Sequence, residues 1–142
     1  MEFIYNKEDI KGILPHREPF QFVDNVVEIC ESKRIISNYK IPEDSFWNEA
    51  HFPGYPIMPG VLLIEMMAQT SGLLICAFQK EYKGGMLLNV KDARFRNNAV
   101  PGDFVEMECI LISQVGNMAE FECEVRTQSK KLADANIVLM FN

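Results

Sequence analysis

Residues His51 to Gln69 read HFPGYPIMPGVLLIEMMAQ, and this stretch decides the fold. Its first half is a loop rich in proline and glycine, and its second half is an apolar run that carries one carboxylate, Glu65. Proline is favoured at the first position of a helix. We therefore expect a long helix that begins at Pro59 or Gly60 and ends near Lys80.

The apolar run is long enough that a membrane-spanning helix must be considered. From Ile57 to Phe78 it contains one charged residue, Glu65, and the amide of Gln69. A carboxylate and an amide near the middle of a bilayer would both be costly. The sequence instead predicts a central helix that the rest of the protein buries on nearly all sides, with no membrane span.

The segments around this helix have the alternation of strands. In one of them Val105, Met107 and Cys109 share a face, while Glu106 and Glu108 share the other. A sheet of sequential antiparallel strands with one apolar helix is most simply built by curling the sheet around the helix. We therefore expect a single α+β domain over residues 1–142. The expected strands are 20–29, 34–41, 86–97, 104–114, 118–129 and 132–141, and a short helix is expected over 6–14.

Composition and charge exclude several classes of protein. A net charge of −6 argues against a surface for nucleic acid or anionic membranes. The N-terminus lacks the basic and apolar regions of a signal peptide. The four cysteines are scattered, without the spacing of a zinc site or a disulfide framework. We expect them to be buried, reduced thiols, as in a cytoplasmic protein. They are Cys30, Cys76, Cys109 and Cys123.

Glu65 is the first candidate for chemistry. Apolar residues surround it along the helix, and burial disfavours an ionised carboxylate, so we expect Glu65 to hold a proton. A protonated carboxyl group is a general acid. Gln69 stands one helical turn further on and can hydrogen-bond to it. A purely structural buried glutamate is the alternative for this residue taken alone.

His51 is the second candidate, because it precedes a loop stiffened by Pro53, Pro56 and Pro59. Neither of the two histidines in the chain has metal-ligand spacing, so we expect no metal. The backbone N–H of Gly60 would lie at the partially positive end of the helix, which suits a carbonyl oxygen that becomes an enolate. This segment could thus supply a base, an acid and an oxyanion donor.

Several motifs in order resemble the (3R)-hydroxyacyl-[acyl-carrier-protein] dehydratases of fatty-acid synthesis, a hotdog-fold family. The resemblance covers nearly the whole chain and implies an antiparallel sheet of about six strands wrapped around one long helix. The matching motifs are 14–20 (LPHREPF) with Val23 and Asp24, 51–69, 93–96 (ARFR) and 100–103 (VPGD).

The resemblance implies a role for each site residue. His51 would be the base that removes the proton alpha to the thioester, and Glu65 the acid that protonates the departing 3-hydroxyl. The Gly60 N–H would bind the thioester oxygen, and the Ile57 carbonyl would orient His51. Supporting roles fall to Gln69, Pro53 and Gly54.

The resemblance also implies the partners. Dimers are expected in which the histidine of one subunit meets the carboxylate of the other, and these dimers often form hexamers. The substrate would arrive on the phosphopantetheine of an acyl carrier protein, with no cofactor or metal. Since carrier proteins are acidic, the candidate docking residues are basic. They are Arg17, Lys91, Arg94 and Arg96.

Some residues depart from the family pattern. Ala50 stands where glycine is usual, Met86 and Leu87 where aromatic residues line the acyl tunnel, and Asn89 where a small residue is usual. These departures leave the acyl specificity open, and a related polyketide or aryl-polyene pathway is an alternative. A hotdog acyl-thioesterase and a non-catalytic scaffold subunit are the two other functions that the sequence allows.

Overall fold

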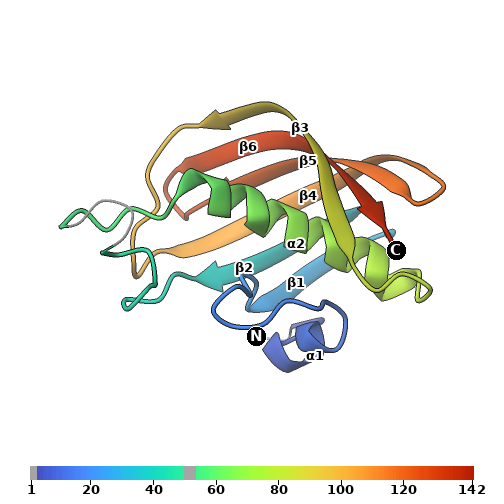
Figure 1. Ribbon diagram of the computed structural model, residues 1–142, viewed down its shortest axis with the longest axis horizontal. Coiled ribbons are helices and arrows are strands. Elements are labelled where there is room, and N and C mark those ends of the chain that lie inside the picture. Colours follow the sequence, from blue (N-terminus) through green and yellow to red (C-terminus); the bar gives the residue numbers. More distant parts are fainter. Residues whose placement is uncertain (1–2, 50–53) are drawn as a thin grey trace.

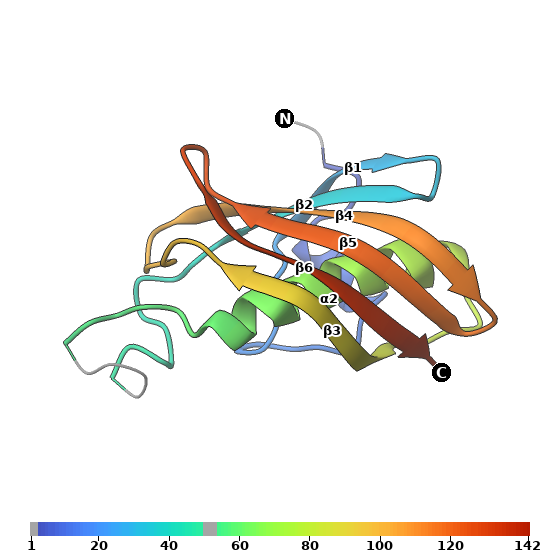
Figure 2. The same cartoon turned by 90° about the horizontal axis from the view of Figure 1, so that it is seen from above.

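The computed structural model describes residues 3–49 and 54–142. Within these residues the strands form one antiparallel sheet in the order β1-β2-β4-β5-β6-β3. Figure 1 shows helix α2 lying along one face of this sheet, and Figure 2 shows the sheet bending around it. The expected hotdog architecture is therefore confirmed. The elements are α1 (Lys7–Lys11), β1 (Asn25–Cys30), β2 (Arg34–Lys40), α2 (Gly60–Phe78), β3 (Gly85–Phe95), β4 (Phe104–Val115), β5 (Met118–Arg126) and β6 (Lys131–Phe141).

Helix α2 is the centre of the hydrophobic core. Pro59 is its N-cap residue, and most of its side chains are buried. In the described part of the chain it is the one helix long and apolar enough to cross a membrane, yet 78% of its apolar 18-residue stretch is buried inside the protein. The inward faces of β4 and β5 pack in the same core, where the six side chains of Val105, Met107, Cys109, Phe121, Cys123 and Val125 are buried.

One stripe of α2 stays open, contrary to the expectation of burial on nearly all sides. Val61 is 72% exposed, and Glu65 and Ala68 are only partly buried. These three residues follow a spacing of four and three, which places them on one face of the helix. The sheet and the segment from Leu14 to Phe22 cover the other faces, so the stripe remains open in a single chain.

The two edges of the sheet differ in their protection. The N-terminal segment covers β1, where Ile4 N–H donates to Val26 O at 2.9 Å and Val26 N–H donates to Tyr5 O at 2.8 Å. At the opposite edge every residue of β3 is exposed. An exposed edge strand is a template for pairing with another chain, and proteins normally cover or blunt it.

The inner side of β3 is also apolar. Leu87 pairs with Leu139, and Val90 pairs with Ile137. Both partners on β6 are buried, so Leu87 and Val90 point toward the helix side of the sheet. They are nevertheless 40% and 37% exposed, since no described element covers them.

Two expectations about the N-terminal third are wrong. A helix was expected over residues 6–14, and Asn6 caps helix α1 with a capping box to Asp9, but the helix ends at Lys11, where Gly12 forms its C-cap. Cys76, Cys109 and Cys123 are buried, whereas Cys30 is exposed at the end of edge strand β1. The prediction of four buried thiols therefore fails for Cys30.

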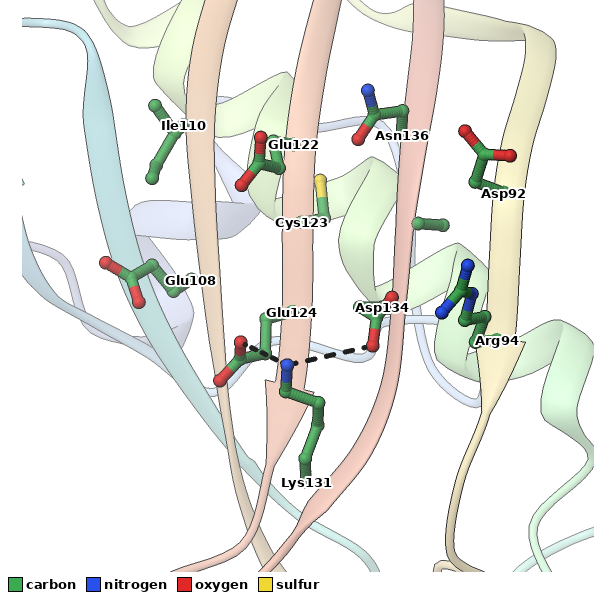
Figure 3. A pocket seen from close by; sticks show the side chains of 11 residues that line it. Asp92, Arg94, Glu108, Ile110, Glu122, Cys123, Glu124, Lys131, Asp134 and Asn136 are labelled. Carbon is green, nitrogen blue, oxygen red and sulfur yellow. Dashed lines mark ion pairs between the residues drawn. The ribbon is translucent and has the colours of Figure 1, made fainter.

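The outer face of the sheet, which points away from α2, carries a network of charges. Lys131 Nζ lies 3.2 Å from Glu124 and 3.8 Å from Asp134. These side chains line a hollow of about 310 Å³, with Arg94 and Asp92 on its β3 side (Figure 3). Opposite charges pair across neighbouring strands here, so this face stabilises the sheet.

We expect Glu108 on this face to make the stability depend on pH. The hydrogen bond from Arg34 holds the pKa of Glu108 below its usual value of 4.5, and Arg126 adds to the effect. The folded protein therefore binds this proton less readily than the unfolded chain does. The stabilisation is complete above pH 4.5 and is lost as the pH falls through the folded pKa.

Thermal unfolding between pH 7 and pH 3 measures this effect. The wild type should be more stable than Glu108→Gln at neutral pH, and the difference should shrink below pH 4.5. A difference that stays constant across the whole range would contradict this assignment.

Candidate functional site

Glu65 lies on the open stripe of α2, where a carboxyl group is within reach of a ligand. Its side chain is 23% exposed, so it is less buried than the apolar sequence around it suggests. The exposure follows from the stripe that the sheet leaves uncovered. The carboxyl group borders a small pocket of about 80 Å³. Its lining residues are Leu14, His16, Glu65, Ala68, Gln69, Gly72, Gly85 and Leu87.

Gln69 holds the Glu65 carboxyl group, as the helical spacing predicts. Gln69 Nε2 donates to Glu65 Oε2 at 2.9 Å and to Phe20 O at 2.9 Å. Gln69 Oε1 accepts from the Phe22 N–H at 2.8 Å. The buried amide thus has partners for its oxygen and for its nitrogen, which fixes its orientation and aims one N–H at the acid.

His16 also lies at this site, where the sequence did not predict it. His16 Nε2 lies 3.4 Å from Glu65 Oε2, across the pocket. The only signals in the sequence were that histidine is rare in this chain and that His16 stands within the LPHREPF motif. Local spacing could not predict a contact between residues so far apart in the chain.

The N-terminus of α2 borders a second hollow. Gly60 is the first residue of the helix, and its N–H belongs to the first turn, where no intrahelical acceptor exists. A Cβ atom at Gly60 would lie 3.0 Å from the Phe95 ring, so the small residue lets this ring approach the helix end. Gly60, Phe95 and Ile57 line a hollow of about 260 Å³.

The loop before α2 is described only in part. His51 and Pro53 lie outside the described residues, as does Ala50, so their predicted roles stay predictions. Gly54 has a φ of 78°, a left-handed conformation that favours glycine. Ile57 lines the hollow at the helix start, beside Met58, whose N–H donates to Ala99 O at 2.8 Å.

Arg17 serves the chain's own backbone. Its guanidinium donates to three carbonyl oxygens, those of Leu14 at 2.9 Å, His16 at 2.7 Å and Lys11 at 3.0 Å. These bonds hold the segment that carries His16 against the end of α1. Its predicted part in carrier docking remains untested.

The other three basic candidates gather at β3 and just beyond it. Lys91 Nζ lies 3.8 Å from Glu120, and Arg96 Nε donates to Asp134 at 2.7 Å. Arg94 lines the charged hollow of the outer face (Figure 3). Lys91 and Arg96 remain 49% and 42% exposed, so both can exchange these partners for an acidic ligand.

Comparison with known proteins decides the family. A family model described as the FabA-like domain matches residues 14–136. The chain belongs to the FabA-like domain family. It is 42% identical over 135 residues to a 3-hydroxyacyl-[acyl-carrier-protein] dehydratase FabZ of Rhizobium rhizogenes, with 93% of this chain and 85% of that protein covered. It is 40% identical over 137 residues to a FabZ protein of Agrobacterium fabrum, with 93% and 86% covered.

Solved structures show the same fold. This FabA-like chain matches the dehydratase heterocomplex ApeI:P from Xenorhabdus doucetiae with a TM-score of 0.78 and 20% identity, covering 94% of this chain and 90% of that one. It matches a hypothetical thioesterase with coenzyme A from Streptococcus pneumoniae TIGR4 with a TM-score of 0.64 and 12% identity, covering 95% of both. At these identities the likeness concerns the fold, which both kinds of protein share.

Proposed function

We propose that this protein dehydrates (3R)-3-hydroxyacyl-[acyl-carrier-protein] to the trans-2-enoyl thioester in fatty-acid biosynthesis. The observation that carries the proposal is the carboxyl group of Glu65, held by Gln69 on the open stripe of α2 in a chain of the FabA-like family. Relatives about 40% identical over most of the chain are named for this reaction.

The proposed reaction needs one base and one acid. His51 removes the proton alpha to the thioester, and the bonding electrons form the new C2–C3 double bond. The bond from C3 to the hydroxyl oxygen breaks, and Glu65 supplies the proton with which that oxygen leaves as water. A proton must then pass from His51 to Glu65 to restore the starting state.

The helix start stabilises the charge that develops on the thioester oxygen. The Gly60 N–H stands at the partially positive end of α2 and is proposed to donate to this oxygen. The Ile57 carbonyl is proposed to orient His51, while Pro53 and Gly54 shape the loop between them. No cofactor or metal is proposed, since the base, the acid and the helix end supply the required chemistry.

We propose that two copies of the chain pair through β3 and share their active sites. The strand is an unprotected edge, and its inner side is apolar at Leu87 and Val90. Leu87 also lines the pocket at Glu65, so a partner that covers β3 would close the site. Completion of the site by the partner's His51 is the arrangement we propose, with hexamers as a further level of assembly.

We expect the substitution Val90→Lys to split this dimer. A lysine on the inner side of β3 would place a charge in the apolar part of the interface, where burial of an unpaired charge is costly. Sedimentation velocity should show at least about twice the mass of one chain for the wild type, and one chain mass for the variant. Val115→Lys is the matched control, because Val115 is 76% exposed at the far end of β4 and lies outside the proposed interface. A dimeric Val90→Lys protein would contradict pairing through β3.

The substrate is proposed to arrive on the phosphopantetheine of an acyl carrier protein in the cytoplasm. Carrier docking is assigned to Lys91, Arg94 and Arg96, with Arg17 as a more distant contributor. The three residues near β3 sit beside the proposed dimer edge and keep exposed cationic groups.

The proposed function is tested by the reversible hydration of a crotonyl-carrier thioester, followed by ultraviolet absorbance and mass spectrometry. Turnover by the wild type and its loss in His51→Ala support the dehydratase assignment. Release of free thiol with an acyl thioester would instead support a thioesterase. Carrier binding without turnover of any thioester would support a scaffold subunit.

A further inference from the structure

We propose that His16 is a positioning residue for the acid Glu65. This inference rests on the proposed dehydratase function and adds a residue to its site. Three observations support it. They are the position of the His16 ring beside Glu65, the hydrogen bonds that hold the backbone around His16, and the burial of His16 Nδ1 without a hydrogen-bond partner among the described residues.

The ring of His16 and the amide of Gln69 converge on one oxygen atom. Glu65 Oε2 lies 2.9 Å from Gln69 Nε2 and 3.4 Å from His16 Nε2. The two nitrogens come from different parts of the chain, α2 and the segment after α1. Catalytic hydrogen bonds are commonly longer in the free enzyme and shorten in the complex with substrate.

The segment that carries His16 is held before any substrate arrives. Arg17 donates to the carbonyl oxygens of Leu14 and His16, on either side of Pro15, and also to that of Lys11. Leu14 is buried in the core at 4% exposure. The backbone on both sides of His16 is thus held in place, which is how a site is pre-organised.

The second ring nitrogen indicates which nitrogen carries the proton. Among the described residues, His16 Nδ1 is buried and has no hydrogen-bond partner. A buried N–H without an acceptor is rarer in proteins than an unpaired acceptor. The tautomer with its proton on Nε2 is therefore favoured, and Nε2 is the ring nitrogen that lies 3.4 Å from Glu65 Oε2.

The groups beside Oε2 favour one of the two carboxyl oxygens of Glu65 as the site of its acidic proton. Glu65 Oε2 accepts a hydrogen bond from Gln69, and an N–H on the nearby His16 Nε2 further favours Oε2 as an acceptor. The acidic proton of Glu65 is then favoured on Oε1, the oxygen left to face the departing hydroxyl group. Without His16 only Gln69 would favour this arrangement, so fewer molecules would hold the proton on Oε1 and be ready to react.

Two substitutions at His16 separate positioning from simple packing. Glutamine can place an N–H at the reach of Nε2, whereas leucine fills similar space without a donor. We expect His16→Leu to lower kcat by about tenfold, the effect of one hydrogen bond to a carboxyl group, with KM changed by less than about twofold. His16→Gln should keep kcat within about threefold of the wild type. Equal loss in both variants, or a loss confined to KM, would overturn the proposal.

A double variant tests whether His16 acts through Glu65. If it does, His16→Leu should cause no further loss once Glu65→Gln is present, because the proton that it positions is gone. A further tenfold loss in the double variant would show that His16 acts on its own.

Nitrogen NMR of the wild type tests the contact without relying on turnover or on a folded leucine variant. His16 should show the Nε2–H tautomer, and its Nε2 signal should move in Glu65→Gln. The Nδ1–H tautomer, or an Nε2 signal that does not move in Glu65→Gln, would overturn the proposal. If the wild type turns over no thioester while the NMR contact is present, the proposed function fails and the pairing of His16 with Glu65 stands.

Discussion

Glu65→Gln is expected to lower kcat for dehydration by about 10³-fold, because it removes the general acid and leaves the shape of the site intact. The glutamine oxygen can still accept from Gln69, whose other bonds to Phe20 and Phe22 do not involve residue 65. The fold should therefore survive. Initial rates with a 3-hydroxyacyl-carrier thioester, together with thermal unfolding, measure both outcomes.

Glu81→Gln is the matched control for this variant. It makes the same change of chemical group at an exposed residue beyond the end of α2 and should retain wild-type kcat. Wild-type activity in Glu65→Gln would remove Glu65 from the mechanism, whatever the control shows. Loss of the unfolding transition in Glu65→Gln would assign the residue a structural role.

The architecture was predictable because its patterns are local. Pro59 marks the start of α2, and the alternation around Val105 and Phe121 reports which side of β4 and β5 faces the helix. These signals need only neighbouring residues, so a single sequence contains them. The contact between Glu65 and Gln69 belongs to the same class, because it spans one helical turn.

The features that the sequence could not predict depend on contacts between residues far apart in the chain. A strand was expected over residues 20–29, but β1 begins at Asn25. The backbone of Phe20 and Phe22 bonds to the side chain of Gln69 instead of to a neighbouring strand. The same segment brings His16 to Glu65, a contact that appears only when the chain is folded.

The exposure of Glu65 has a related cause. An apolar sequence around a residue predicts burial, yet the stripe of Val61, Glu65 and Ala68 faces away from the sheet in one chain. The apolar residues of this stripe and of β3 agree with the pairing of two copies that we propose, since no described element of the chain itself covers them. The proposed assembly therefore rests on a feature of the sequence, namely apolar residues that the described fold does not cover.

Two inactive variants are expected to restore activity when they share a dimer. If the base of one subunit works with the acid of the other, a dimer of His51→Ala and Glu65→Gln has one site with both groups and one site with neither. Co-expression with two different tags, followed by purification on both, should recover up to about half of the wild-type activity. Each variant alone should be about 10³-fold slower than the wild type.

The control for this experiment replaces one partner with the double variant His51→Ala/Glu65→Gln, paired with Glu65→Gln. No site in that dimer contains the acid, so it should stay inactive. If both groups of a site come from the same chain, the first mixture should stay inactive too, since each chain lacks one of them. Recovery in the first mixture alone therefore places the histidine and the carboxyl group on different subunits, and it explains why β3 leaves the pocket at Glu65 open in a single chain.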